Sequence, residues 1–373
     1  MKILIFNWRD ITHPQAGGAE LHIYKQAKRW VKWGHEVTLF CGGYNGNIEY
    51  DEVSGIKIIR KGNQYSVYLH AVWNYLRHWR KKCDVVIDDI NGVPFFTPLY
   101  VRKPKLAIIH HLVKSIFFKV LPYPFALLGY LAEKSIPIIY KKTPFITVSK
   151  STKEEMIKEG IKRENIRIIP NGIDSKNYKP NFELKTPYPS IVYLGRLKRY
   201  KRLHILINAM KKIVKVIPNA KLYIAGHGDR EEFLKELTKK LGLEYSIKFL
   251  GFVSECEKIN LLQSAWVFVT PSEKEGWGIT VTEANLCGTP AVSFKVNGLK
   301  ESIKNKVTGI LVQEGKLKEF EDAIIKVLSE KDLRAKLARN AIDYARQYNW
   351  DTSARLGLEM LERIVNGKFY KSI

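Results

Sequence analysis

Short apolar runs alternate with helical patterns along the first half of the chain. The apolar segment Lys2–Asn7 predicts an opening strand, and the periodic apolar positions from Glu20 to Trp33 predict a helix that stops at Gly34. Further buried strands are predicted at residues 35–40, 84–88, 105–109 and 144–148. The sequence Ser-Thr-Lys-Glu at 151–154 predicts a capping box at the start of the next helix. Strands that alternate with helices indicate a parallel sheet covered on both faces.

The same alternation restarts after a polar, proline-containing segment at residues 174–190, where we place the linker between two domains. One helix is predicted at residues 202–217 because its apolar side chains share one face. The other elements predicted in this half are strands at 190–194, 221–225, 247–250, 267–270 and 290–294, and helices at 319–329 and 332–347. The expected fold class is α/β, with two Rossmann-like doubly wound domains facing across a cleft. Ligands in such sheets lie at the carboxyl ends of the strands.

Length and charge narrow the choice of partner. The chain has 373 residues, which suits two domains, and 62 Lys and Arg against 37 Asp and Glu give a net charge of +25. Such an excess favours an anionic partner: a nucleic acid, an anionic membrane surface or a phosphorylated substrate. The longest uncharged apolar stretch, Val120–Ala132, has thirteen residues, fewer than the roughly 20 of a membrane-spanning helix. The four cysteines lack metal-ligand or redox spacing, so we expect a cytoplasmic protein with reduced thiols.

Two glycines and two basic residues lie where an anion could bind. Gly17 and Gly18 fall between the first predicted strand and helix, so their N–H groups could approach an anion, or they could form a plain tight turn. Arg196 and Lys201 follow the first strand of the second half, where they could clamp a diphosphate or belong to a solvated basic turn.

The most informative stretch runs from Glu275 to Glu283. Glu275 lies in a glycine-rich loop, and Glu283 lies about one turn into the helix that follows. Two carboxylates suit the recognition of a polyhydroxyl compound, since each accepts hydrogen bonds from hydroxyl groups. The N–H groups around Gly278, Ile279 and Thr280 would face a phosphate at the start of this helix. The alternative is a charged loop followed by a surface glutamate.

Two features of the first half leave alternatives open. His110 and His111 close the strand at 105–109, and neighbours on a strand point to opposite faces, so one histidine should face the cleft. Residues 67–82 predict a helix with apolar Leu, Val and Trp on one side and basic residues beside it. This helix either packs into the core through its apolar side or forms a surface for anionic lipid.

Taken together, the motifs resemble the retaining glycosyltransferases of family 4, which have the GT-B fold. The matching pieces occur in the family's order along nearly the whole chain: Gly17-Gly18-Ala-Glu20, the strand ending at His110, Ile146–Ser149, Ile169–Asp174, Gly195-Arg196 with Lys201, Gly226-His-Gly228, Pro271-Ser272 with Glu275 to Glu283, and Gly288–Pro290. The resemblance implies an acceptor-side domain at 1–180, a nucleotide-sugar-binding domain at 181–350 and a helix at 351–373 that crosses back to the first domain.

The resemblance also implies roles for these residues. His110, Glu275, Arg196 and Lys201 are the expected catalytic residues, with Arg196 and Lys201 on the donor diphosphate. Glu275 is expected on hydroxyls of the transferred sugar and Glu283 on the ribose. The remaining expected substrate contacts are Gly17, Gly18, Gly278, Ile279 and Thr280.

The implied reaction moves a hexosyl group from a UDP- or GDP-linked sugar to an acceptor hydroxyl with retention. It needs neither metal nor cofactor, because the basic residues and the helix start stabilise the leaving diphosphate. The acceptor is expected to be a glycan or a lipid-linked precursor. The enzyme is expected to be a peripheral protein at the inner face of the cell membrane. Nucleic acid is not expected to be a partner. The alternatives are a basic non-enzymatic binder of nucleic acid or membrane, and an epimerase or phosphorylase on the same fold. The pair Glu275 and Glu283 argues against a polyanion binder, which gains nothing from two carboxylates.

Overall fold

The computed structural model describes residues 1–369, and its contacts divide the chain into two units. Unit 1 comprises Met1–Gly172 and the segment from Trp350 onward, and unit 2 comprises Ile173–Asn349. The division falls before residue 180 because Ile173 pairs with Asn349 in a β-bridge and Tyr178 is buried in the core of unit 2. Residues 370–373 of the expected C-terminal segment lie outside the described residues.

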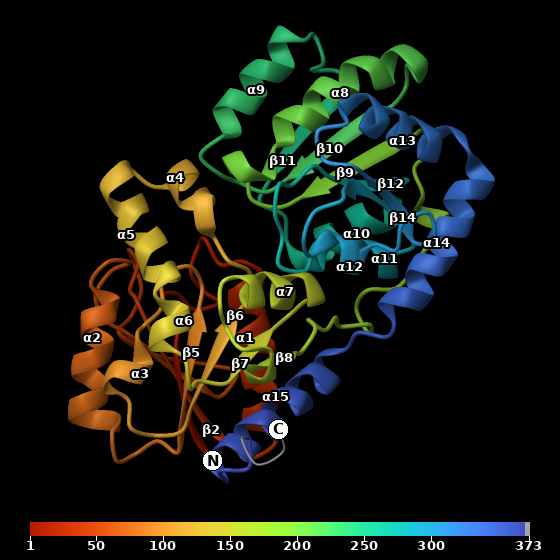
Figure 1. Cartoon of the computed structure of the whole chain (residues 1–373). Helices are drawn as coiled ribbons and strands as arrows, with labels where there is room; N and C mark the ends of the chain where they lie inside the picture. Colours follow the sequence, from red (N-terminus) through yellow and green to blue (C-terminus); the bar gives the residue numbers. More distant parts are fainter. Residues whose placement is uncertain (370–373) are drawn as a thin grey trace. The chain divides into compact units, whose positions relative to one another are not determined.

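Unit 1 is built on an eight-stranded sheet in the order β3-β4-β2-β1-β5-β6-β7-β8 (Figure 1). All neighbouring strands are parallel except the antiparallel pair β3 and β4. The strands are β1 (Lys2–Phe6), β2 (Glu36–Cys41), β3 (Tyr50–Val53), β4 (Ile56–Arg60), β5 (Val85–Ile90), β6 (Lys105–Ile109), β7 (Phe145–Thr147) and β8 (Ile166–Ile168). The apolar pattern predicted β1, β2, β5, β6 and β7 to within about two residues, and missed the short strands β3, β4 and β8.

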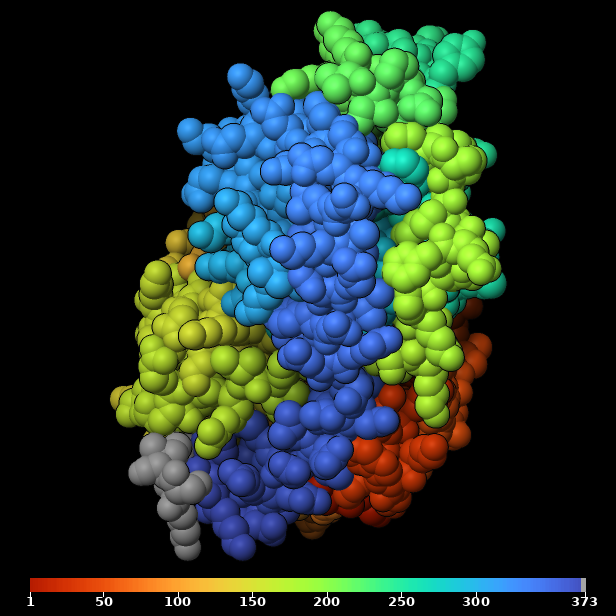
Figure 2. Space-filling model, turned by 90° about the vertical axis from the view of Figure 1, so that its right-hand side faces the viewer, coloured from red at the N-terminus to blue at the C-terminus, as the bar shows by residue number. Residues whose placement is uncertain are grey.

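Helices cover both faces of this sheet because successive strand residues point to opposite sides. Ile3 and Ile5 of β1 pack with α1 and α15, whereas Leu4 and Phe6 pack with α2 on the other face. The helices of unit 1 are α1 (Gly18–Lys32), α2 (Val67–Asn74) continued by a π-helical turn η1 (Tyr75–Trp79), α3 (Thr97–Tyr100), α4 (Phe117–Val120) preceded by a 3₁₀ turn η2 (Lys114–Ile116), α5 (Tyr123–Lys134), α6 (Ile136–Ile139), α7 (Lys150–Lys158), η3 (Arg163–Asn165) and α15 (Trp350–Val365). Figure 2 shows α15, in dark blue, at the surface of unit 1.

One prediction of local structure in unit 1 is wrong, and one of the two alternatives for residues 67–82 does not hold. Helix α7 is capped by Ser149, whose side chain accepts from the Thr152 N–H, so the predicted capping box at Ser151 does not form. Of the two alternatives left open for residues 67–82, core packing does not hold for Leu69 and Trp73, which are 76% and 52% exposed. The opposite side of α2, with Val67 and Ala71, packs on the sheet instead.

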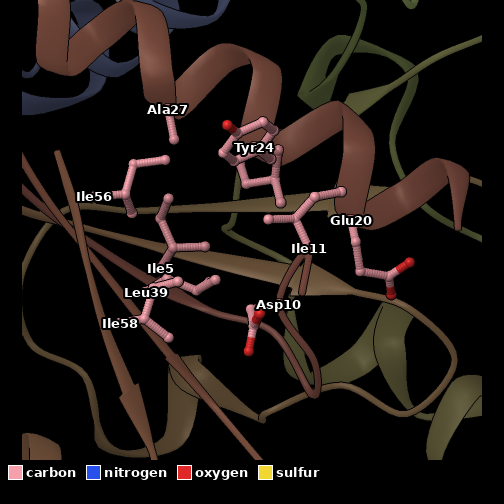
Figure 3. A pocket seen from close by; sticks show the side chains of 10 residues that line it. Ile5, Asp10, Ile11, Glu20, Tyr24, Ala27, Leu39, Ile56 and Ile58 are labelled. Atoms are coloured by element: carbon pink, nitrogen blue, oxygen red, sulfur yellow. The ribbon is translucent and has the colours of Figure 1, made fainter. Parts of the chain in front are cut away.

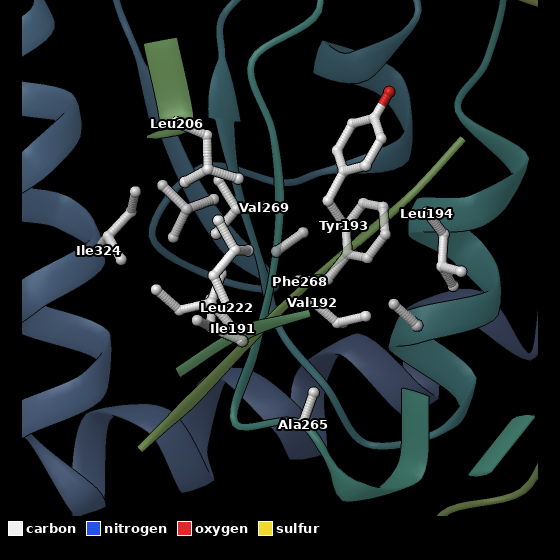
Figure 4. Close-up of a cluster of buried hydrophobic side chains, with 14 of the residues drawn as sticks. Ile191, Val192, Tyr193, Leu194, Leu206, Leu222, Ala265, Phe268, Val269 and Ile324 are labelled. Atoms are coloured by element: carbon white, nitrogen blue, oxygen red, sulfur yellow. The ribbon is translucent and has the colours of Figure 1, made fainter. Parts of the chain in front are cut away.

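Unit 2 is built on a six-stranded parallel sheet in the order β11-β10-β9-β12-β13-β14. The strands are β9 (Ser190–Leu194), β10 (Lys221–Ala225), β11 (Ile247–Gly251), β12 (Val267–Thr270), β13 (Ala291–Phe294) and β14 (Gly309–Val312). The helices are η4 (Phe182–Leu184), η5 (Arg199–Lys201), α8 (Leu203–Val216), α9 (Glu231–Lys240), α10 (Glu255–Ser264), α11 (Ile279–Leu286), α12 (Leu299–Ser302), α13 (Leu317–Ser329) and α14 (Lys331–Ala345). Central strands β9 and β12 are buried throughout, as expected of parallel strands covered on both faces (Figure 4).

Candidate functional site

Two loops of unit 2 come together just beyond the carboxyl ends of β9 and β10. The Leu197 N–H donates to the carbonyl of His227 at 2.9 Å. A Cβ atom at Gly226 would lie 2.1 Å from the Gly195 carbonyl oxygen, and Gly226 itself has a left-handed φ of 127°. A larger side chain would therefore push the two loops apart. The glycine motif at 226–228 holds in place the loop that carries Arg196 and Lys201.

Lys201 and Glu275 form an ion pair, although 74 positions separate them in the sequence. The Lys201 ammonium lies 2.5 Å from Glu275 Oε1, and both side chains are mostly buried. Burial opposes the charge on Lys201, but the neighbouring Glu275 carboxylate outweighs it and raises the pKa of Lys201. Arg196 is held alongside, since its guanidinium donates to the Tyr200 hydroxyl at 2.9 Å. The structure thus brings the predicted diphosphate and sugar residues into one cluster.

The glycine-rich loop after β12 leads into the N-terminus of α11. Gly278 has a left-handed φ of 88°, and a Cβ there would lie 2.7 Å from the Leu299 side chain. No side chain of the described residues caps this helix, so the first N–H groups, at Ile279 and Thr280, carry the positive end of the helix dipole without a side-chain acceptor. This end of α11 can bind an anion.

Glu283 lies one turn further into α11 and is almost fully buried. Its Oε1 atom lies 3.1 Å from the Lys258 ammonium and 3.1 Å from the Tyr178 hydroxyl, while Oε2 has no hydrogen-bond partner among residues 1–369. Burial raises the pKa of Glu283, and Lys258 partly offsets that effect. Glu255 completes the group, 2.9 Å from Lys258 and 2.5 Å from the Tyr178 hydroxyl. The alternative of a surface glutamate is excluded for Glu283.

In unit 1, the adjacent strands β1, β5 and β6 bring together three polar side chains at their carboxyl ends. His110 Nε2 lies 2.9 Å from Asp89 Oδ1, and the Asn7 amide donates to Asp89 Oδ2 at 2.7 Å. All three side chains are buried. A carboxylate only accepts hydrogen bonds, so Nε2 of His110 carries a proton and the ring is held in one orientation. Burial raises the pKa of Asp89, while His110 opposes the shift.

A second buried histidine packs against His110. The ring of His22 lies 5.0 Å from that of His110 in an edge-on arrangement, and its Nδ1 lies 2.6 Å from Asn171 Oδ1. Burial, reinforced by His110, lowers the pKa of His22 to about 3. His22 is therefore neutral, and it lies on the same face of α1 as Gln26, which bonds both His22 and Ser353 of α15.

The Gly17-Gly18 turn is engaged by a carboxylate of its own chain. The Gly17 N–H donates to Glu20 Oε2 at 2.7 Å, and Arg9 donates to Glu20 Oε1 at 2.8 Å. Burial favours the neutral carboxyl, but Arg9 and the hydrogen bonds outweigh it and lower the pKa of Glu20. Glu20 thus occupies the Gly17 N–H that was expected to approach an anion. A direct contact of Gly17 or Gly18 with substrate stays a prediction.

Sequence reasoning missed Asp89, His22 and the structural role of Glu20. The signal for Asp89 was present in the consecutive aspartates, Asp88 and Asp89, near the end of a buried strand. The neighbouring Asp88 points to the other face, where Thr97 and Tyr140 donate to it, and burial raises the pKa of Asp88 to about 6. Within residues 1–369, no three His, Cys, Asp or Glu side chains are grouped to hold a metal ion.

Unit 1 also contains a small, partly open cavity between α1 and strands β1, β2 and β4 (Figure 3). Its lining is mostly aliphatic, with Asp10 and Glu20 at one side. Its free volume is about 10 Å³, which is about the size of one water molecule and far too small for a sugar. The cavity is therefore a packing gap beside the polar clusters.

Comparison with solved structures defines the class. The Anabaena protein HepE, solved in complex with UDP and glucose, superposes with a TM-score of 0.78 at 22% identity, covering 97% of this chain and 99% of that chain. Two Rossmann-like parallel α/β units with this similarity define the GT-B fold, as predicted.

The family follows from the sequence comparisons. Residues 174–344 match the family described as glycosyl transferases group 1, and residues 16–177 match glycosyltransferase family 4. An uncharacterized glycosyltransferase of Methanocaldococcus jannaschii is 29% identical over 97% of this chain and its own full length. One of the phosphatidylinositol N-acetylglucosaminyltransferase subunits of Arabidopsis thaliana is 24% identical over 80% of this chain and 69% of its own length. The chain belongs to the group 1 glycosyltransferases of family 4.

Proposed function

We propose that the protein transfers a hexosyl group from a UDP- or GDP-linked sugar to an acceptor hydroxyl, with retention at the anomeric carbon. The observation that carries this proposal is the cluster at the carboxyl ends of β9 and β12, where the Lys201–Glu275 ion pair lies on the same loops as Arg196 and the start of α11. It combines positive groups for a diphosphate with a carboxylate for sugar hydroxyls. HepE, which has this fold, was solved with UDP and glucose.

In this proposal the leaving diphosphate gains negative charge as the glycosidic bond breaks. Arg196, Lys201 and the N–H groups of Ile279 and Thr280 stabilise that charge, and because they are already held in place they need little reorganisation. Glu275 exchanges part of its contact with Lys201 for sugar hydroxyls when the donor binds. Glu283, oriented by Lys258 and Tyr178, accepts from the ribose hydroxyls. In unit 1, Asp89 fixes the ring orientation of His110, the residue that the proposal assigns to the reacting sugar.

The acceptor is proposed to be a lipid-linked or glycan precursor, which unit 1 receives. Support comes from the similarity to one of the phosphatidylinositol N-acetylglucosaminyltransferase subunits, whose name specifies a lipid acceptor. No helix within residues 1–369 is long and apolar enough to cross a bilayer. The proposal also places the enzyme at the inner face of the cell membrane as a peripheral protein, and the net charge of +25 supports an anionic surface as partner.

A donor panel tests this function. UDP- and GDP-linked hexoses are incubated with the protein, and slow donor hydrolysis and the shift in melting temperature are measured for each. A cognate nucleotide at 100 times its dissociation constant stabilises the native state by about 2.7 kcal/mol. Absence of both hydrolysis and thermal stabilisation across all UDP- and GDP-linked donors would overturn the proposal.

A further inference from the structure

Two helical segments of unit 1 turn their large apolar side chains outward. In α5, the residues that pack inward are Ala126, Gly129 and Glu133, whereas Phe125 and Leu128 on the opposite side are 47% and 64% exposed. A helix on the surface of a water-soluble domain normally has the reverse arrangement.

The segment α2–η1 also turns large apolar side chains outward. Leu69, Trp73 and Leu76, at helical spacing, are all about half exposed or more, while Val67, Ala71 and Tyr75 face the core. We define the outward face by the exposed apolar residues of both segments: Tyr65, Leu69, Trp73, Leu76, Phe118, Tyr123, Phe125, Leu128 and Leu131.

The α4–α5 hairpin is firmly anchored. The Phe117 ring packs on Gly129, where a Cβ atom would lie 2.8 Å away, so the two helices touch closely. At its base, Glu133 accepts hydrogen bonds from the N–H groups of Val113 and Lys114, at 2.5 and 2.7 Å. The Lys114 ammonium in turn pairs with Glu159, directly after α7, at 2.8 Å. The exposure of the hairpin's apolar side chains is therefore a property of folded, anchored structure.

The two segments form one surface with a strongly basic border. The rings of Tyr65 and Phe125 lie 5.4 Å apart, which joins the start of α2 to α5. Exposed Arg77, Arg80, Lys81 and Lys82 follow Trp73 directly, and the Arg77 guanidinium lies 5.6 Å from the Trp73 ring. Between residues 65 and 134 the acidic residues are Asp84, Asp88, Asp89 and Glu133, of which only Asp84 is exposed.

We propose that this outward face docks onto an anionic lipid bilayer. The aromatic and leucine side chains enter the headgroup and upper acyl region, and Arg77, Arg80, Lys81 and Lys82 contact lipid phosphates. A second copy of the chain fits less well, because two identical basic borders would repel one another in a protein of net charge +25. The inference deepens the proposed function, on which it rests, by naming the surface that meets the membrane.

Vesicle co-sedimentation of the full chain, without donor or acceptor, tests this surface. The vesicles are pure phosphatidylcholine, or phosphatidylcholine with about 30% phosphatidylserine, each at low and high salt. We expect binding to the anionic vesicles that weakens with salt. Neutralising Arg80, Lys81 and Lys82 to glutamine should lower the partition coefficient about fivefold per charge, which corresponds to about 1 kcal/mol each.

A matched pair of variants tests whether the apolar residues of the outward face contribute specifically to vesicle binding, or whether any exposed apolar residue does. Phe125→Ser with Leu128→Ser should reduce binding at least tenfold. The control, Val216→Ser with Tyr245→Ser, removes exposed apolar side chains from unit 2 and should bind like wild type. Circular dichroism and melting curves confirm that each variant folds.

Several results would overturn the inference: no sedimentation with anionic vesicles at low salt, equal binding to neutral vesicles, or equal loss in the control. The outward face would instead be a contact with a second copy under two conditions. Light scattering would show a dimer that the variant with Phe125→Ser and Leu128→Ser does not form, and the wild-type protein would not bind vesicles. Donor hydrolysis is measured separately. Vesicle binding without hydrolysis would count against the proposed function alone, and hydrolysis without vesicle binding against the surface alone.

Discussion

Replacing Glu283 by glutamine keeps the shape of the side chain and removes its negative charge. The change should cost little in the fold, because Lys258 keeps its ion pair with Glu255 at 2.9 Å. It should weaken donor binding, because hydrogen bonds from ribose hydroxyls to a charged acceptor contribute about 1.5–3 kcal/mol. That range corresponds to a roughly 10- to 150-fold increase in the dissociation constant of the nucleotide.

Titration calorimetry with UDP and GDP measures this increase directly, and thermal unfolding provides a second readout. At a nucleotide concentration 100 times the wild-type dissociation constant, wild type gains about 2.7 kcal/mol and a variant that binds thirtyfold more weakly gains only about 0.9 kcal/mol. Turnover at saturating donor should change much less than affinity, because the ribose contact exists equally in the ground and transition states.

The matched control is Glu255→Gln, which alters the same Tyr178–Lys258 group from its exposed side. We expect this variant to bind nucleotide with nearly wild-type affinity. An unchanged dissociation constant in Glu283→Gln, or an equal loss in Glu255→Gln, would refute the ribose assignment.

Four further predictions follow from the two clusters. Arg196→Ala and Lys201→Ala should each lower kcat about 100-fold or more, since charge on the leaving diphosphate grows in the transition state; near-normal steady-state turnover in the double variant contradicts this. Turnover should persist in excess EDTA, and loss restored by magnesium or manganese would show that a metal is required. Asp89→Asn should lower kcat more than it changes the donor dissociation constant, because it loosens His110; parallel changes in both would point to a structural role. His22→Asn should change how the free energy of unfolding depends on pH below neutrality. Neutral His22 contributes stability above its unfolded pKa near 6.5 that is lost as pH falls toward the folded pKa of about 3, so the stability gap between wild type and variant should narrow by about 2 kcal/mol from pH 7.5 to 5 in urea titrations. A constant gap would show that His22 is not buried in its neutral form.

Much of the fold could be predicted because each buried parallel strand has a recognisable pattern in its own short stretch of sequence. Each of β1, β5, β6, β9 and β12 is a largely apolar run with polar residues at or just after its carboxyl end, so strand positions, fold class and family were all confirmed. The strands β3, β4 and β8 were missed because they lie at or next to the edges of the sheet, where charged residues interrupt the apolar run. The location of Glu275 and Glu283 on the loop and helix after β12 also followed from the sequence.

Contacts within the clusters could not be predicted, because they depend on which strands become neighbours. The ion pair of Lys201 with Glu275 requires that β9 lies beside β12, although β10 and β11 separate them in the chain. Asp89 meets His110 for a similar reason, through the pairing of β5 with β6. Strand order is a property of the complete sheet.

The helix α2 shows most clearly what the sequence determined and what the tertiary structure decided. Helical spacing alone established that Leu69, Trp73 and Leu76 share a face, and this is correct. It could not establish which face of the helix is covered, because both faces carry apolar residues and the choice depends on the shape of the sheet surface beneath. Val67, Ala71 and Tyr75 pack against that sheet, so Leu69, Trp73 and Leu76 face solvent. Periodicity therefore fixes which residues lie together, and long-range packing decides whether they form a core or a surface.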